Sequence, residues 1–128
     1  MLNFTTKEQK MAQEAYERVS VRSHDKDFDK EYKNFALSFP SLIHSCGLVQ
    51  AVAFAQAKDK GEYIDDLQKV FDTTDNAGDL RTKSREAPVM EYMRITRHAI
   101  AAAGWIKRYC QAYGNDENKG GNNIAELP

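Results

Sequence analysis

Apolar residues recur at helical spacing from the start of the chain. Thr5 and Glu8, three residues apart, have the form of a capping box, and Phe4 is placed to act as a hydrophobic staple. A first helix is therefore predicted to begin at Thr5 or Thr6 and to end near Ser23. Its buried stripe, spaced every four residues, consists of Met11, Ala15 and Val19.

The segment 26–58 is the most apolar part of the chain. Pro40 lacks a backbone donor and clashes with the preceding turn, so a kink or break is predicted just before it, and Gly47 weakens the helix again. The segment 48–57, LVQAVAFAQA, is apolar almost all round, which is typical of a helix at the centre of a bundle. The inward-facing residues before it are predicted to be Phe28, Tyr32, Phe35, Phe39, Leu42, Ile43 and Cys46.

Two amphipathic segments follow, 61–75 and a last helix after Pro88. Between them lies a polar connection with room for a short helix at 80–85. Pro88 suits the first turn of the last helix because its missing N–H is not needed there. That helix is predicted to reach Tyr113 and to stop at Gly114. Before the connection, the segment 61–75 is predicted to turn five residues inward at helical spacing: Tyr63, Ile64, Leu67, Val70 and Phe71.

These segments predict an all-α fold, a single compact bundle of five or six helices over residues 1–113. A chain of 128 residues suits one domain with a core of its own. The bundle is predicted to close around residues 48–57 and to bury Phe54, so that alanine at this position costs about 3–5 kcal/mol. The polar, Gly- and Asn-rich segment 114–128 is predicted to be a disordered tail.

Composition places the chain among ordinary globular proteins, with 41% hydrophobic and 29% charged residues. The N-terminus lacks the apolar region of a secretory signal. No apolar stretch is close to the length of about 20 residues that a membrane-spanning helix needs. A cytoplasmic location without a membrane partner is therefore expected. Cys46 and Cys110 are interpreted as buried thiols in a reducing compartment, and a disulfide between them would depend on their approach in space.

The formal net charge of −1 hides two oppositely charged segments. Residues 59–79 contain seven acidic residues and two lysines, a local net charge of −5. Residues 81–108 contain seven basic residues and two glutamates, a local net charge of +5. Such an asymmetry can orient one subunit against the next or place a basic face on a phosphate backbone.

The last predicted helix concentrates part of this positive charge on one face. Its apolar face is predicted to carry Tyr92, Thr96, Ala99, Ala103, Ile106 and Cys110. The opposite face carries three arginines, a histidine and the only tryptophan: Arg94, Arg97, His98, Trp105 and Arg108. Arginine binds phosphate through a planar fork, and tryptophan can stack on a base.

Two interpretations of this face remain open. It is either a solvated helix face whose Trp105 is packed by a neighbouring helix, or a surface that binds a partner. Arginine and tryptophan are also enriched at protein–protein hot spots. The residue types therefore indicate an interface and do not by themselves specify RNA.

No catalytic, cofactor or metal motif stands out. His44 and Cys46 would point about 200° apart on a helix and cannot chelate one ion. A general acid–base ribonuclease would need a histidine pair or a histidine with a placed lysine, but His24, His44 and His98 fall on three predicted elements. The chain is therefore expected to be no enzyme and to use no cofactor and no metal.

Two segments resemble a known family. One is YKNFALSFPSLIHSCGLVQAVAFAQAK, residues 32–58, and the other is EYMRITRHAIAAAGWIKRYCQAY, residues 91–113. Together they resemble the small (fifth) subunit of the type III-B CRISPR RAMP module, the Cmr complex. The first pattern is carried by Phe39, Pro40, Ile43, Gly47, Leu48, Gln50, Ala51, Ala53 and Phe54. The second is carried by Tyr92, Thr96, Arg97, Ala99, Ala102, Ala103, Trp105, Ile106, Lys107, Arg108 and Tyr109.

The resemblance implies a compact, non-catalytic helical subunit that stacks with further copies of itself as the minor filament of the complex. It implies that the chain lies beside other Cmr subunits and helps to hold the duplex of guide RNA and target RNA in antiviral defence. The surface contacts that the resemblance carries over to this chain are Arg97, Trp105, Lys107 and Arg108. Two alternatives remain: a small RNA-processing enzyme that uses His98, and a helical adaptor without RNA contact.

Overall fold

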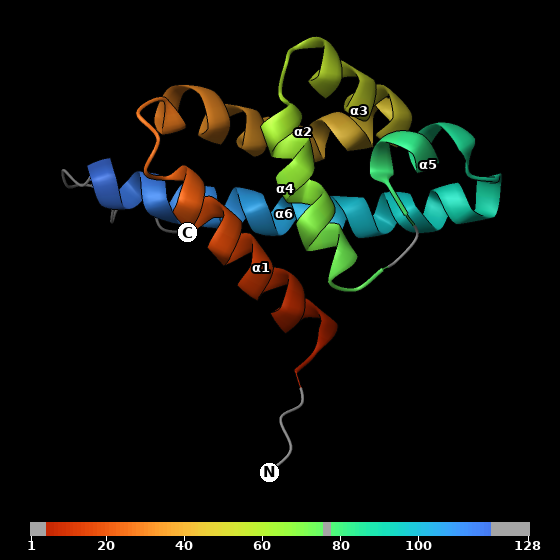
Figure 1. Cartoon of the computed structure of the whole chain (residues 1–128), viewed down its shortest axis with the longest axis horizontal. Coiled ribbons are helices and arrows are strands. Elements are labelled where there is room, and N and C mark those ends of the chain that lie inside the picture. The colour runs from red at the N-terminus through yellow and green to blue at the C-terminus, as the bar shows by residue number, and fades with distance from the viewer. Residues whose placement is uncertain (1–4, 76–77, 119–128) are drawn as a thin grey trace.

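The fold consists of six α-helices and one short π-helical turn, and no strand occurs among the residues that the structure describes, 5–75 and 78–118. The computed structural model is drawn in Figure 1. Along the chain its elements are α1 (Lys7–Arg22), η1 (Phe28–Tyr32), α2 (Lys33–Cys46), α3 (Leu48–Ala57), α4 (Gly61–Asp72), α5 (Leu80–Glu86) and α6 (Val89–Asn118). The predicted all-α bundle is confirmed. None of the described helices is long and apolar enough to cross a membrane.

Helix α6 is the element on which the other helices pack. It extends along the whole molecule in Figure 1, with α2 beside it, α4 crossing it and α1 resting against it. Its buried face consists of Ile95, Ala99, Ala102, Ala103, Ile106 and Cys110. Alanines on this face let the neighbouring helices approach closely. Four of the six residues predicted for this face are buried, whereas Tyr92 and Thr96 are only partly buried. Ile95 and Ala102 are buried on this face although they were not predicted.

Helix α3 was predicted to be the centre of the bundle, and this was wrong. It packs on α2, α4 and α5 at the edge of the fold, above the long α6 helix in Figure 1. Only one face of α3 is buried, namely Leu48, Ala51, Val52 and Ala55. Its ten residues carry no charge that would mark the solvent side, so the sequence pattern could not distinguish a half-buried helix from a central one.

Phe54 lies on the solvent side of α3 and is 41% exposed, so it is not a core residue. Its ring stacks on that of Phe35 on α2, with 6.3 Å between the ring centres and 8° between the planes. Cys46, also predicted to be buried, is exposed at the end of α2, where its thiol donates to the carbonyl of Leu42.

The capping box of α1 begins at Thr6, one residue later than in the predicted pair Thr5–Glu8. Thr6 is the N-cap: its hydroxyl accepts from the backbone N–H of Gln9 at 3.0 Å, and the Gln9 side chain accepts from the N–H of Thr6 at 2.8 Å. The capping box is therefore Thr6–Gln9, and the predicted pair Thr5–Glu8 was wrong. Phe4, the proposed staple, lies outside the described residues.

Of the kink or break predicted before Pro40, the break does not occur, because helix α2 continues to Cys46. Phe39 and Ile43 are both buried, so packing of successive turns against the core keeps the helix intact despite the missing donor. The break falls at Gly47, where φ is +88°. A side chain there would come within 3.3 Å of the Tyr92 hydroxyl, which accepts from the N–H of Val49 and so caps α3.

The second half of the chain follows its pattern closely. The five residues predicted to face inward on α4 are all buried. The short helix α5 is capped by Asp79, whose carboxylate accepts from the N–H of Thr82. Helix α6 continues through Gly114 to Asn118, so the predicted stop was wrong, since a glycine inside a helix costs only about 1 kcal/mol. The tail predicted to be disordered was 114–128; its first five residues belong to α6, and 119–128 lie outside the described residues.

The burial of aromatic rings generates the first prediction. Phe71 is fully buried, and its replacement by alanine should lower the free energy of unfolding by about 3–5 kcal/mol because it leaves a cavity. Phe54→Ala should lower it by less, about 1–2 kcal/mol, since this side chain is 41% exposed and only part of it is packed. Urea unfolding followed by circular dichroism measures both. Equal losses of stability would contradict the placement of α3 at the edge.

Candidate protein- and RNA-binding surface

Two arginines occupy the solvent side of α6. At about 100° per residue, Arg97 and Arg108 lie opposite the buried face of this helix, and both are exposed. Neither forms an ion pair with any residue whose side chain the structure describes, 5–75 and 78–113. Their guanidinium groups are therefore open to an anionic ligand or to an acidic partner.

Arg94 and His98, predicted to belong to the same stripe, bind a carboxylate of the chain itself. The Asp75 side chain, just beyond α4, is 6% exposed and forms an ion pair with Arg94. His98 Nδ1 lies 3.4 Å from Asp75 Oδ2, and the His98 ring meets Phe71 edge to face. These two residues therefore join the end of α4 to α6.

Trp105 takes part in helix packing. It is half-buried, and its ring stacks on that of Tyr109 with 6.1 Å between centres. Tyr109 in turn meets Tyr16 of α1 edge to face at 5.7 Å. Trp105 therefore packs on a residue of its own helix, and Tyr109 makes the contact with α1.

Lys107 is half-buried on the other flank of α6, about 200° around the helix from Trp105. The six residues predicted to bind RNA or a partner therefore lie in different environments. Arg97 and Arg108 are the two of them that are exposed.

The two oppositely charged segments partly neutralise each other inside the chain. Asp65 of α4 pairs with Arg81 of α5 at 3.2 Å, and Asp75 pairs with Arg94. The sequence pattern did not reveal these pairs, because ion pairs between residues 16 and 19 positions apart depend on how the helices pack. The local charge of +5 therefore overstates the positive charge that this region presents to a ligand.

A buried polar network joins three helical elements. The Asp66 carboxylate on α4 is 1% exposed and accepts two hydrogen bonds from Arg22 of α1, at 2.8 and 3.1 Å. It accepts a third, at 2.7 Å, from the hydroxyl of Tyr32 at the end of η1. Arg22 also approaches Glu62 at 3.5 Å and lies 5.8 Å above the Tyr32 ring. All charged atoms of the buried carboxylate are therefore paired.

The sequence contained a signal for Asp66 that the prediction did not use. Asp66 follows Tyr63 by three residues and precedes Val70 by four, so it falls on the apolar face of α4. A carboxylate in that position requires a partner, because an unpaired buried charge is strongly unfavourable. Its partners, Arg22 and Tyr32, could not be identified from spacing alone.

The two side chains that donate hydrogen bonds in this network, Arg22 and Tyr32, keep their protons at neutral pH. The hydrogen bond with Asp66 raises the pKa of Arg22 above its ordinary value. Burial, followed by the nearby Asp66 charge, raises the pKa of Tyr32, and burial also raises the pKa of Tyr63. Burial raises the pKa of the Cys110 thiol to about 12. The network is therefore suited to holding helices together and not to transferring protons.

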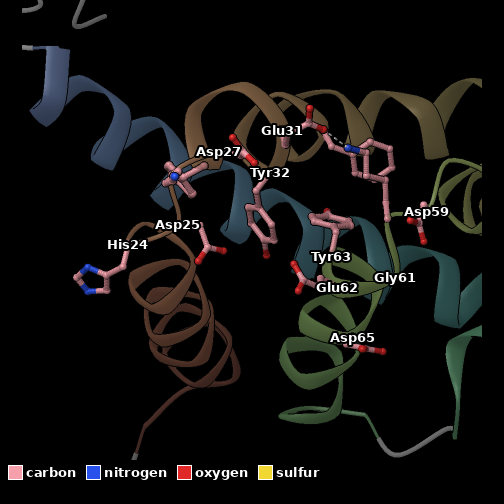
Figure 2. Close-up of a pocket in the computed structure, with 14 residues that line it drawn as sticks. His24, Asp25, Asp27, Glu31, Tyr32, Asp59, Gly61, Glu62, Tyr63 and Asp65 are labelled. Atoms are coloured by element: carbon pink, nitrogen blue, oxygen red, sulfur yellow. Dashed lines mark hydrogen bonds and ion pairs between the residues drawn. The ribbon is translucent and has the colours of Figure 1, made fainter.

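A cleft of about 990 Å³ opens between the end of α1, η1 and the start of α4. Figure 2 shows carboxylates from all three sides around it, while His24 points away from the other labelled side chains. Its acidic lining residues are Asp25, Asp27, Glu31, Asp59, Glu62 and Asp65, against Lys26 and Lys60. This cleft would repel phosphate and suits a basic segment of a partner.

The three histidines do not meet in this cleft. His24 is its only histidine, His44 is exposed on α2, and His98 lies against Asp75. Among residues 5–75 and 78–113, whose side chains the structure describes, no group of three or more His, Cys, Asp or Glu side chains is arranged to hold a metal ion.

Comparison with known proteins connects this fold to one family. A family model described as "CRISPR-associated protein (Cas_Cmr5)" matches residues 7–113. A Thermus thermophilus protein named "CRISPR system Cmr subunit Cmr5" is 37% identical over 110 residues, covering 84% of this chain and 95% of the relative. The chain belongs to the Cmr5 family.

A solved Cmr5 structure shares the fold as well. The crystal structure of a CRISPR-associated Cmr5 family protein, also from Thermus thermophilus, superimposes with a TM-score of 0.76 at 36% identity, covering 85% of this chain and 98% of the other. The resemblance drawn from the two sequence segments is thereby confirmed. In this Cmr5-family chain the first segment forms the end of η1 and the α2–α3 hairpin, and the second lies in α6.

The buried network yields a stability prediction with an internal control. Asp66→Ala should lower the free energy of unfolding by about 3 kcal/mol, because it leaves the Arg22 charge and the Tyr32 hydroxyl without their partner. Asp65→Ala, which removes the neighbouring exposed ion pair, should cost less than about 1 kcal/mol. Denaturant unfolding of both variants measures the two free-energy changes. Similar losses of stability in the two variants would show that the network contributes little.

The two cysteines should differ in reactivity. Both are free; Cys46 is exposed, whereas Cys110 is buried and has a raised pKa. A thiol reagent such as DTNB should therefore label one thiol per chain in the native protein and two after unfolding. In Cys46→Ser the fast native reaction should disappear. Rapid labelling of two thiols in the native protein would contradict the burial of Cys110.

Proposed function

We propose that the chain is a non-catalytic structural subunit of the type III-B CRISPR Cmr complex. The observation that carries this proposal is the match to the Cmr5 family across residues 7–113, together with a relative that is named as a subunit of the Cmr system. The match covers the helical bundle from α1 to Tyr113 in α6. A shared fold of this extent supports a shared place in an assembly.

Within the complex, the proposed place is the minor filament, beside the subunits that hold the guide RNA. Its partners would be other Cmr subunits, further copies of this chain, and the duplex of guide and target RNA, in antiviral defence. The charges of the surface support contacts of this kind. The cleft of Figure 2 is acidic, whereas the solvent side of α6 presents Arg97 and Arg108, so one subunit offers surfaces of both signs.

The residues proposed to meet RNA or a neighbouring subunit are Arg97 and Arg108, with Lys107 at the flank of the same helix. The role of Arg94, His98 and Trp105 would be to hold α6 against α4 and α1, so that this surface is rigid. A rigid helix face presents its guanidinium groups at fixed spacing, about 16 Å apart along the axis for residues 11 positions apart.

The prediction concerns target retention by the assembled complex. Arg97→Gln with Arg108→Gln should leave the fold and assembly intact, since both side chains are exposed and unpaired among the described residues. Each lost phosphate contact should reduce the slope of log K against log salt by about 1 per subunit, so the loss of affinity is largest at low salt. Lys7→Gln with Lys10→Gln, which removes equal charge from α1, is the control.

The experiment uses a tagged chain purified from its host, with guide RNA and the larger subunits expected to co-purify. Unchanged target affinity at every salt concentration would exclude this surface from RNA binding. Failure of the double variant to join the complex would show a protein interface instead. A chain that purifies without RNA or Cmr subunits would contradict the proposed assembly. Cleavage of labelled RNA by the chain alone, abolished by His98→Ala, would favour an RNA-processing enzyme.

A further inference from the structure

A second surface, on the α2–α3 hairpin, carries an aromatic pair that the proposed function does not use. Phe54 is 41% exposed and lies nearly parallel to Phe35, with 6.3 Å between ring centres. One side of the Phe54 ring is therefore supported by another ring, while part of it remains in contact with solvent. The pair therefore offers a partly exposed aromatic face on which a planar ligand can stack.

Lysines surround this aromatic pair. The two rings lie in a shallow groove of about 470 Å³, lined by Lys30, Glu31, Asn34, Phe35, Ser38, Phe54, Lys58 and Lys60. Lys58 Nζ lies 5.6 Å from the centre of the Phe54 ring, and Lys60 Nζ lies 5.7 Å from that of Phe35. The only carboxylate in the lining, Glu31, pairs with Lys60 at 2.8 Å. Within the described residues, Lys30 and Lys58 form no ion pair.

The surface around the groove is free of negative charge along the hairpin. Residues 32–58 contain no aspartate or glutamate. The exposed polar side chains of α2 and α3 are instead neutral or can become positive: Asn34, Ser38, Ser41, His44, Ser45, Gln50 and Gln56. A polyanion lying along this hairpin would meet no carboxylate until it reached Glu31 or Asp59. The acidic cleft borders the groove at Glu31 and Lys60, which confines an anionic ligand to the hairpin side.

Aromatic rings within a positively charged groove are the arrangement by which proteins bind single-stranded nucleic acid. A protein partner could also cover Phe54, but three lysines against one already paired carboxylate favour a polyanion. A base-paired duplex hides its base faces, so only an unpaired nucleotide can stack on the ring. We propose that the Phe35–Phe54 pair is a single-stranded RNA contact, in which an unpaired base stacks on Phe54 while Lys30 and Lys58 hold the flanking phosphates.

This inference does not depend on the proposed place in the Cmr complex, because the isolated chain carries the whole groove. Non-specific binding by such a surface is weak, on the order of 10⁻⁴–10⁻⁶ M at physiological salt, so binding is measured at low salt. The probe is a short fluorescent oligouridine, and its anisotropy is compared with that of a blunt duplex of equal length. The single strand should bind more tightly than the duplex.

The aromatic contact is tested by Phe54→Ala. It should weaken oligouridine binding by about 5- to 100-fold, the range expected for loss of one base–aromatic stack. Phe54→Trp, which keeps an aromatic face, should retain binding. Val49→Ala removes a side chain that is 38% exposed on the same helix and should leave binding unchanged. Circular dichroism and urea unfolding establish that each variant is folded.

The lysines are tested through the salt dependence. Lys30→Gln and Lys58→Gln should each reduce the slope of log K against log salt by about 0.7, the value for one phosphate contact to a single strand. Lys69→Gln, an exposed lysine of α4 outside the groove, is the matched control and should leave the slope unchanged.

Two results would overturn the proposal: wild-type affinity for oligouridine in Phe54→Ala, or equal affinity for single strand and duplex. The first result, accompanied by loss of complex assembly in Phe54→Ala, would identify a protein-docking surface. In an assembled complex, 4-thiouridine in unpaired positions of the guide or of the target distinguishes the two sources of RNA. A cross-link to the peptide that contains Phe54 from either strand supports the proposal, and a cross-link from neither contradicts it.

Discussion

The arrangement of α1, η1 and α4 depends on one buried carboxylate. Asp66 lies on the inward face of α4, where an unpaired charge would be strongly unfavourable, so its side chain requires donors within hydrogen-bond distance. Arg22 at the end of α1 supplies two, and Tyr32 at the junction of η1 and α2 supplies the third. These three bonds fix where α1, α4 and the start of α2 meet. Apolar packing against α6 is non-directional, whereas the fork of Arg22 accepts only one orientation of the carboxylate.

Ion pairs within the chain also decide which charges remain for partners. Asp75 forms an ion pair with Arg94 and lies against His98. Asp65 forms an ion pair with Arg81. Cationic side chains without an ion pair among the described residues then lie on several elements, and they include Arg97 and Arg108 on α6 and Lys30 and Lys58 beside the α2–α3 groove. A chain with a net charge of −1 can therefore present two cationic surfaces and one acidic cleft. The net charge did not indicate these charged surfaces, because it adds up groups that the fold pairs or separates.

Residues of the pattern shared with the Cmr5 family have different physical roles in this chain. Phe39, Ile43 and Leu48 are buried and hold the hairpin against the core. Gly47 allows the turn between α2 and α3, because its φ of +88° and the nearby Tyr92 hydroxyl leave no room for a side chain. Phe54 belongs to neither group, since it is exposed and contributes little to the core. One sequence motif of apolar residues thus combines residues that stabilise the fold with one residue that is exposed on the surface.

The sequence by itself determined the features that are local. The 3.6-residue period specified the helices, the inward face of α4 and most of the buried face of α6, and Pro88 marked the start of the last helix, because these signals act within a few residues. Even the cap of α1 was placed to within one residue. Only the tertiary structure decided that α6 and not α3 lies at the centre, and that Phe54 and Cys46 face solvent. An apolar helix without charged residues fits either position, and the choice depends on which distant helices pack against it. The same holds for Arg94 and His98, whose partner Asp75 comes from another part of the chain and is brought to them only when α4 crosses α6.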